Sequence, residues 1–178
     1  MADLVVPVSA HDHIRGPVNA PLTLVQYADF QCPHCAAAYP EIAAIATELS
    51  DSLRLVLRHF PLVQVHPQAQ RAAEAAEAAA SQGRFWDMAS LLYENQEELD
   101  DHSLGRYARK TSLDLKRFKK ELSSGAHAAR VRADYLGGVR SGVNGTPTFF
   151  INGKRYDGTF KSEALVAALL NESRGAHR

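Results

Sequence analysis

The sequence predicts an α/β fold in which a βαβ unit and a ββα unit lie on either side of an all-helical insert. Apolar, β-branched runs accompany helical patterns near both ends of the chain, whereas the middle carries helical patterns only. With 178 residues, 46% of them hydrophobic, the chain can bury a core as one domain with one inserted subdomain. We therefore expect a first half over residues 1–61, a helical insert over 62–142 and a second half over 143–178.

The first half contains the predicted βαβ unit. A short edge strand is expected around Asp12–Arg15, followed by a buried strand over Leu22–Phe30, which is apolar and β-branched. The run from Ala36 to Leu49 has apolar residues on one helical face. A second strand is expected over Leu53–Phe60, ended by Pro61.

The middle of the chain predicts only helices. We expect them over residues 67–82, 84–94, 103–110, 115–122 and 126–137. The first is rich in alanine, which permits close approach of a neighbouring element. In the fourth, Asp114 is a candidate N-cap, and Leu115, Phe118 and Leu122 form the expected buried stripe.

The end of the chain returns to strands. Two short apolar or β-prone runs, Thr148–Ile151 and Lys154–Tyr156, flank Asn152-Gly153, which is a strong signal for a two-residue hairpin turn. A last amphipathic helix is expected over Glu163–Leu170. Large aromatic residues, Phe30, Trp86, Phe149 and Phe150, are expected in the core.

The only two cysteines, Cys32 and Cys35, lie where the first long strand turns into a helix, in the order Cys32-Pro33-His34-Cys35. A helix N-terminus stabilises an anion through its unpaired N–H groups and its dipole, and a thiolate there is the nucleophile of thiol–disulfide exchange. A purely structural disulfide over so short a loop would remove little entropy from the unfolded chain. The motif therefore indicates redox chemistry on sulfur.

A second motif connects this chemistry to a known family. The run Gly145–Phe150, with Thr146-Pro147 before a hairpin, resembles the cis-proline loop of the thioredoxin superfamily. Together with Phe30–Cys35 and the helical insert, it makes the chain resemble DsbA-like oxidoreductases from about Asn19 to Leu170. The resemblance implies a thioredoxin-like fold. It also implies a protein dithiol–disulfide oxidoreductase that forms, reduces or isomerises disulfides through a mixed-disulfide intermediate.

The resemblance assigns roles to the cysteine motif. Cys32 would be the attacking thiolate, placed early on the loop where solvent and a substrate disulfide can reach it. Cys35 would be the more shielded resolving thiol. Pro33 and His34 would tune the pKa of Cys32, because Pro33 fits the first helical position and His34 can carry positive charge near pH 7. The Pro-His dipeptide is also that of DsbA, which implies an oxidising bias.

The resemblance also assigns substrate contacts. Pro147 is expected to be cis and to expose the backbone of Thr146, so that an extended substrate chain can pair with it. A Thr before this proline resembles isomerase-type and reductase-type members more than DsbA, where the residue is Val. Thr146 and His34 thus favour opposite directions of net reaction, and the direction stays open.

Two polar residues are candidates for proton transfer. Six residues before Cys32, relatives usually carry a buried Asp or Glu that moves the resolving thiol's proton, but this chain has Gln26, which cannot ionise. Asp29 lies nearer the motif and is a candidate shuttle in its place. As a residue at the end of a strand, it could equally be a surface cap.

The charge composition limits the classes of partner that are expected. Twenty basic residues balance twenty acidic ones, which gives no indication of nucleic acid or of an anionic membrane surface. We expect no cofactor beyond the cysteine pair, protein or small-molecule disulfides and dithiols as substrates, recycling by glutathione or a thioredoxin system, and a monomer. The N-terminus shows no basic-then-apolar leader. The expectation is a cytoplasmic protein, with a periplasmic protein whose leader was removed as the alternative.

Two other functions stay open on the sequence. The first is a redox-inert thioredoxin-like binding module, or a metal-binding protein using Cys32, Cys35, His34, His59 and His66. A structural zinc site normally has a second ligand pair at defined spacing, and none is visible; His11 and His13 are more simply solvated. The expectation is therefore no metal. The second is glutathione conjugation, which does not require the resolving cysteine.

Overall fold

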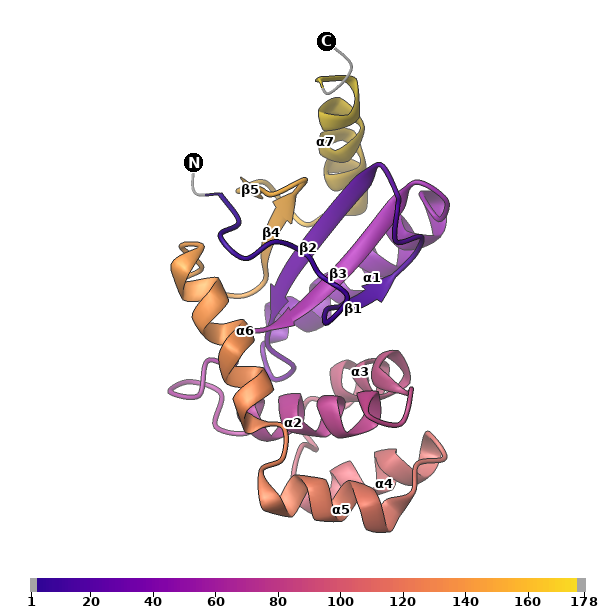
Figure 1. Cartoon of the computed structure of the whole chain (residues 1–178), viewed down its shortest axis with the longest axis vertical. Helices are drawn as coiled ribbons and strands as arrows, with labels where there is room; N and C mark the ends of the chain where they lie inside the picture. Colours follow the sequence, from indigo (N-terminus) through magenta and orange to yellow (C-terminus); the bar gives the residue numbers. More distant parts are fainter. Residues whose placement is uncertain (1–2, 176–178) are drawn as a thin grey trace. The chain divides into compact units, whose positions relative to one another are not determined.

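The computed structural model describes residues 3–175, which form two compact units (Figure 1). The first, here called the sheet unit, contains the chain up to Ala28, then Ala37–Arg58, and then the chain from Gly137 on. The second, the helical unit, contains Asp29–Ala36 and His59–Leu136. The segment Asp29–Ala36, here called the cysteine loop, therefore belongs to the helical unit. It was expected in the first half of the chain.

The sheet unit is built on a five-stranded sheet with the order β1-β3-β2-β4-β5 (Figure 1). The strands are β1 His13–Arg15, β2 Leu22–Ala28, β3 Leu53–His59, β4 Thr148–Ile151 and β5 Lys154–Tyr156. β1 runs antiparallel to β3, and β4 runs antiparallel to both β2 and β5. The α/β fold expected from the sequence is confirmed, with β2 two residues shorter than predicted because the chain turns at Asp29 into the cysteine loop.

The predicted hairpin joins β4 to β5. Asn152 and Gly153 both have positive φ, at 48° and 86°, which is the backbone that a two-residue hairpin turn with the twist of a sheet requires. Asn152 also ties the turn to β2: its side-chain oxygen accepts from the backbone N–H of Thr23, and its own N–H donates to the Thr23 carbonyl. The hairpin signal in the sequence therefore also fixes where β4 pairs with β2.

Two helices complete the sheet unit: α1, Pro33–Glu48, belongs to it from Ala37 on, and α7 spans Ser162–Gly175. The carboxylate of Glu41 in α1 accepts two hydrogen bonds, one from the backbone N–H of Ser162 at the start of α7 and one from the ammonium of Lys161. The hydrogen bond from Lys161, then that from Ser162, lower the pKa of Glu41 to about 2. One ionised side chain therefore joins the two helices.

A buried ion pair joins the N-terminal segment to the sheet. Arg58 of β3 is 2% exposed, and its guanidinium donates to both carboxylate oxygens of Asp12 at 2.8 and 3.0 Å. It also donates to the carbonyls of Val6 and Pro7 and to the hydroxyl of Tyr27. All three nitrogens of the guanidinium thus donate hydrogen bonds within the sheet unit, so this buried charge is fully hydrogen-bonded.

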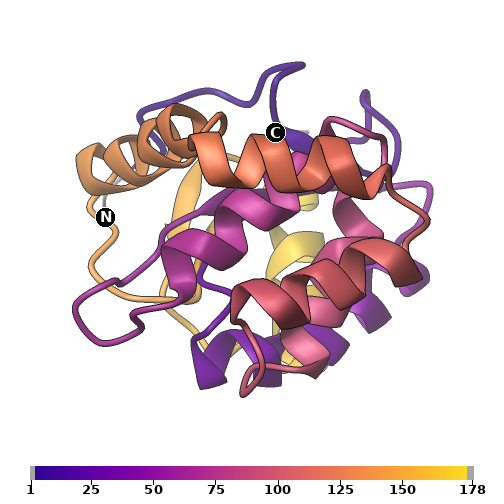
Figure 2. The same cartoon turned by 90° about the horizontal axis from the view of Figure 1, so that it is seen from below.

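The helical unit consists of α2 Ala69–Ala80, α3 Phe85–Glu94, α4 Asp101–Lys110, α5 Leu115–Ser124 and the first part of α6 Ala128–Arg140 (Figure 2, magenta to orange). α2 packs against α3, α4 and α5. Seven of its alanines are buried. Alanine lets neighbouring backbones approach closely, which explains the alanine-rich run noted in the sequence. The structure thus places five helices where the sequence predicted five.

Local details of these helices differ in part from expectation. Asp114 caps α5 as predicted, accepting from the backbone N–H of Arg117. Phe118 and Leu122 are buried, but Leu115 is only half-buried, because it lies in the first turn, at the edge of the apolar stripe. Trp86 is also half-buried, whereas its neighbour Phe85 takes the core position.

Glu121 of α5 is an acid-sensitive link in the helical unit. Its carboxylate accepts hydrogen bonds from the Ser81 hydroxyl at the end of α2 and from the Arg117 guanidinium one turn earlier, and it bonds the His127 imidazole before α6. Burial raises the pKa of this carboxyl, but these hydrogen bonds lower it more, to about 2. Its stabilisation is therefore full above pH 4.5 and is lost as the pH falls toward 2, and solvent screening limits it to about 1 kcal/mol.

We expect Glu121→Gln to destabilise the protein at neutral pH by up to about 1 kcal/mol in urea unfolding. The difference from the wild type should shrink below pH 4.5, where the wild-type carboxylate progressively loses its charge. A difference that stays constant down to pH 2 would show that the charge of Glu121 is not what links these helices.

Candidate redox site

The backbone places Cys32 at the N-terminus of α1. Its carbonyl accepts from the N–H groups of Ala36 and Cys35, both at 3.1 Å, and α1 itself begins at Pro33. These are the bonds of a residue in the N-cap position, which lies at the positive end of the helix dipole. Cys35 lies inside that first turn. As the motif predicted, Pro33 occupies the first helical position, where its missing N–H costs nothing.

Both cysteines are buried. Cys32 is 3% exposed and Cys35 is 0% exposed, whereas Pro33 and His34 between them are exposed. The expectation that Cys32 lies open to solvent was therefore wrong: hydrogen bonds of Asp29 with Leu62 and His66, and of Gln96 with the Cys32 carbonyl, hold the loop against later parts of the chain. What reaches solvent is the Pro-His dipeptide, and Cys32 is only slightly more exposed than Cys35.

Asp29 connects the cysteine loop to the segment after β3 through hydrogen bonds. Its carboxylate is buried and accepts the N–H of Gln31 at 2.7 Å, the N–H of Leu62 at 2.9 Å and the imidazole Nδ1 of His66 at 2.8 Å. The reading of Asp29 as a surface cap was therefore wrong, because the segment after β3 covers it. These contacts join the cysteine loop to residues 61–68. A role in proton transfer stays a prediction.

Two glutamines complete the support of the loop. The side-chain oxygen of Gln31 accepts from the N–H of Gln68 at 2.8 Å. The side-chain nitrogen of Gln96, in the link between α3 and α4, donates to the carbonyls of Phe30 at 2.8 Å and Cys32 at 2.9 Å. Nothing in the local sequence pattern distinguishes the residues that support the loop here, so none of them was predicted: Gln31, Leu62, Gln68 and Gln96.

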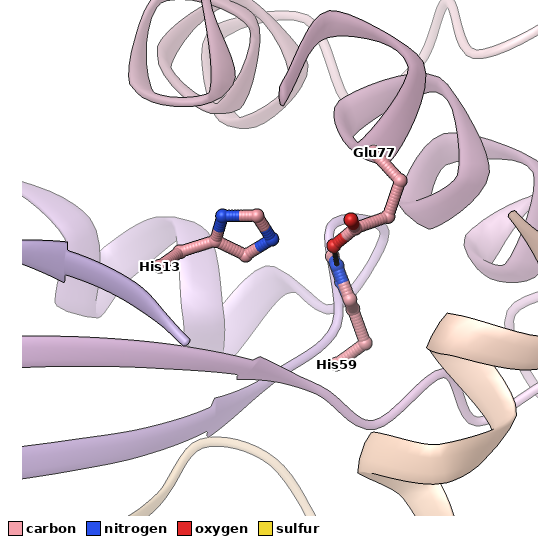
Figure 3. A group of neighbouring side chains, drawn as sticks. All are labelled: His13, His59 and Glu77. Carbon is pink, nitrogen blue, oxygen red and sulfur yellow. Dashed lines mark hydrogen bonds and ion pairs between the residues drawn. The ribbon is translucent and has the colours of Figure 1, made fainter. Parts of the chain in front are cut away.

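A buried histidine lies beside the aromatic residue of this loop. The ring of Phe30 is 4.9 Å from that of Tyr93 and 5.9 Å from that of His59. Figure 3 shows the bond from Nε2 of His59 to the carboxylate of Glu77 in α2, at 2.6 Å. His59 and His66 each bond a carboxylate, and His34 is exposed. Two of the three histidines considered for a zinc site with the cysteines therefore bond carboxylates.

An apolar cavity lies next to this support. Its volume is about 600 Å³, and it is lined by Pro61, Leu62, Val63, Gln64, Val65, Gln70, Ala128, Arg132 and Tyr135. Val63 and Val65 are among the exposed large hydrophobic residues, at 51% and 68%. One wall is thus formed by the segment whose Leu62 N–H binds Asp29, three residues before Cys32.

The predicted substrate-contact residues lie in the sheet unit. The peptide bond between Thr146 and Pro147 is cis, and both residues are half-buried. The hydroxyl of Thr148 donates to the Gly145 carbonyl at 2.7 Å and closes the turn before β4. Gln26 is buried in β2 opposite Phe149 of β4, so it belongs to the sheet core.

Comparison with known proteins identifies the family. Residues 9–171 match the family described as Thioredoxin, which covers nearly the whole chain. The chain belongs to the thioredoxin family. Among solved structures it is similar to oxidised BdbD from Bacillus subtilis, with a TM-score of 0.87, 22% identity and coverage of 97% of this chain and 98% of that one. It is also similar to the thiol-disulfide exchange protein alpha-DsbA2 from Wolbachia pipientis, with a TM-score of 0.78, 18% identity and 91% and 87% coverage.

These similarities confirm the predicted resemblance and fold: a thioredoxin-family chain with the DsbA-type architecture. A curated relative, in contrast, is named as an ion antiporter and not as an oxidoreductase. Over 170 residues the chain is 49% identical to the Na(+)/H(+) antiporter NhaA 3 of Salinispora tropica, covering 95% of this chain and 26% of that protein. The chain thus spans about a quarter of the length of the curated relatives it matches. Within residues 3–175, no helix is long and apolar enough to cross a membrane.

Proposed function

We propose that this protein is a dithiol–disulfide oxidoreductase whose redox pair is Cys32 and Cys35. The observation that carries the proposal is the position of Cys32 at the N-cap of α1 with Cys35 in the first turn. That position favours the thiolate of Cys32, which is the reactive form in exchange. The family and the DsbA-type fold support the same chemistry.

In the reducing direction, the Cys32 thiolate attacks one sulfur of a substrate disulfide. The substrate S–S bond breaks, its second sulfur leaves as a thiolate, and a mixed disulfide with Cys32 forms. Cys35, once deprotonated, then attacks the Cys32 sulfur, which releases the substrate as a dithiol and leaves a Cys32–Cys35 disulfide. Two electrons pass from the cysteine pair to the substrate, and the oxidising direction is the reverse of these steps.

The surroundings of the pair suggest roles for other residues. Pro33 and His34 are the exposed part of the motif and would tune the pKa of Cys32. Thr146 and Pro147 would pair with an extended substrate chain. The cavity next to the loop, with its exposed valines, favours protein substrates with apolar segments over small disulfides. Glutathione or a thioredoxin system would restore the working redox state.

The reduction potential of the pair decides the net direction. A value near about −120 mV, as in DsbA, would make the protein an oxidant, and one near about −270 mV, as in thioredoxin, a reductant. Equilibration of the protein with mixtures of reduced and oxidised glutathione measures it directly.

The proposed function is tested by trapping the intermediate. We expect Cys35→Ser to accumulate a mixed disulfide through Cys32, because the resolving thiol that would release the substrate is missing. Non-reducing electrophoresis and mass spectrometry detect the adduct, and the matched variant Cys32→Ser should form none. Stoichiometric zinc bound to the wild type, with no adduct in either variant, would favour the metal-binding alternative.

The curated relatives add a second candidate, which concerns the partner. Relatives up to 49% identical bear the name of Na(+)/H(+) antiporters. We therefore propose an antiporter of this kind as one partner, whose cysteines the protein oxidises or reduces. The trapping experiment tests this as well. An antiporter among the adducts formed by Cys35→Ser in the native host would support it, and adducts with unrelated proteins alone would reject it.

A further inference from the structure

We propose that Gln96 is a positioning residue that holds Cys32 at the start of α1 and thereby sets the reduction potential of the cysteine pair. The inference rests on the proposed function and extends it to a residue outside the motif. Gln96 lies 64 residues along the chain from Cys32 and reaches it through one side-chain nitrogen, which donates to the carbonyls of Cys32 and Phe30.

The direction of these hydrogen bonds is determined by the partners. Both are backbone carbonyl oxygens, which only accept, so the atom of Gln96 that faces them has to be the amide nitrogen. The two distances, 2.8 and 2.9 Å, are those of well-formed hydrogen bonds. One NH₂ group therefore binds the residue of the attacking sulfur and the residue two positions before it.

The segment that carries Gln96 is itself anchored. The Asn95 side chain donates to the Leu91 carbonyl, and the Tyr107 hydroxyl of α4 donates to the Glu98 carbonyl. Both ends of the link between α3 and α4 are thus tied to the helices that it joins. A side chain on such a segment can hold the loop in one position, whereas one on a mobile link could not.

The contact acts on the group that stabilises the thiolate. The Cys32 carbonyl accepts the first N–H bonds of α1, from Cys35 and Ala36, and also the Gln96 amide. Fixing this carbonyl fixes the first turn of α1 relative to Cys32, so that the positive end of the helix dipole keeps its place beside the residue of the attacking sulfur. The thiolate exists in the reduced pair only. Support for the thiolate therefore favours the reduced state and makes the pair more oxidising.

The test replaces Gln96 by two residues. Gln96→Ala removes the donor, and we expect the pair's equilibrium constant with glutathione to become about tenfold less oxidising, the effect of losing about 1.4 kcal/mol. Gln96→Glu keeps the shape but points an acceptor and a negative charge at two carbonyl oxygens. At neutral pH it should shift the constant further in the same direction and raise the pKa of the Cys32 thiol.

The glutamate variant contains its own rescue. At acid pH its carboxyl becomes protonated and can donate one hydrogen bond again, so the difference between Gln96→Glu and the wild type should narrow as the pH falls. Gln82→Glu is the matched control. Gln82 also bonds a backbone segment of the helical unit, at Asp114, but not the cysteine loop, and this change should leave the potential unaltered.

The outcomes separate this inference from the proposed function. If wild type exchanges with glutathione and both Gln96 variants keep its equilibrium constant, the positioning role is rejected and the proposed function stands. If the wild type shows no exchange at all, the proposed function itself fails. A purely structural role would lower the urea midpoint of the variants without moving the potential, which also rejects the inference.

Discussion

Replacing Cys32 by serine abolishes thiol–disulfide exchange: this is the largest effect that we expect on activity. A serine hydroxyl does not ionise at neutral pH and cannot form a disulfide, so neither the attack nor the mixed disulfide remains. The loss should exceed about a thousandfold, as when the nucleophile of an enzyme is removed. Reduction of insulin disulfides, followed by turbidity, measures it.

The fold should tolerate this change, because serine is nearly the size of cysteine and keeps the backbone groups through which Cys32 bonds Asp29, the first turn of α1 and Gln96. Circular dichroism and the urea midpoint of Cys32→Ser are the controls. Wild-type turnover by a folded Cys32→Ser protein would rule out Cys32 as the nucleophile and with it the proposed mechanism.

The largest expected effect on stability comes from the buried pair of Arg58 and Asp12. Asp12→Ala leaves the Arg58 charge in the core of the sheet unit without its carboxylate. In the wild type, burial lowers the pKa of this guanidinium, but its hydrogen bonds to Asp12 and Tyr27 raise the pKa more. Arginine does not lose its proton in proteins, so without Asp12 the positive charge stays buried and uncompensated. We expect a loss of about 3–5 kcal/mol in urea unfolding.

A matched surface pair provides the control. Arg84 and Asp87 bond at 3.3 Å with side chains that are 53% and 55% exposed, whereas those of Arg58 and Asp12 are 3% and 5% exposed. Asp87→Ala should therefore cost at most about 1 kcal/mol, because solvent already screens that pair. Equal costs for the two variants would mean that the Arg58 network adds no more than a surface ion pair.

Elements with a strong local signal were predictable. β4, β5 and the turn between them were placed at their observed bounds, since Asn-Gly selects one turn type and so sets the register of both strands. The end of β2 was less accurate. The strand stops at Ala28 because the chain turns there, with the Cys32 N–H donating to the Asp29 carbonyl, and the residue pattern alone does not show that hydrogen bond.

Burial was harder to predict at the site itself. A cysteine early on a loop was expected to be open to solvent, yet Cys32 is 3% exposed. Asp29 was expected either to transfer a proton or to be a surface cap, and its burial contradicts only the second of these: its carboxylate accepts hydrogen bonds from two backbone N–H groups and bonds His66. Exposure depends on what packs over a residue, and here the covering segment comes from residues beyond β3.

The reactive pair can be recognised from local sequence, because the strand, the turn, the two cysteines and the first turn of α1 are neighbours along the chain. Local periodicity and the spacing of the motif are enough to place one cysteine at a helix N-terminus and the other within its first turn. The groups that hold the pair in place, in contrast, come together through tertiary packing. Gln96 and His66 reach the loop from 64 and 37 residues away, and no local pattern specifies hydrogen bonds over such separations, which form only when the helices pack.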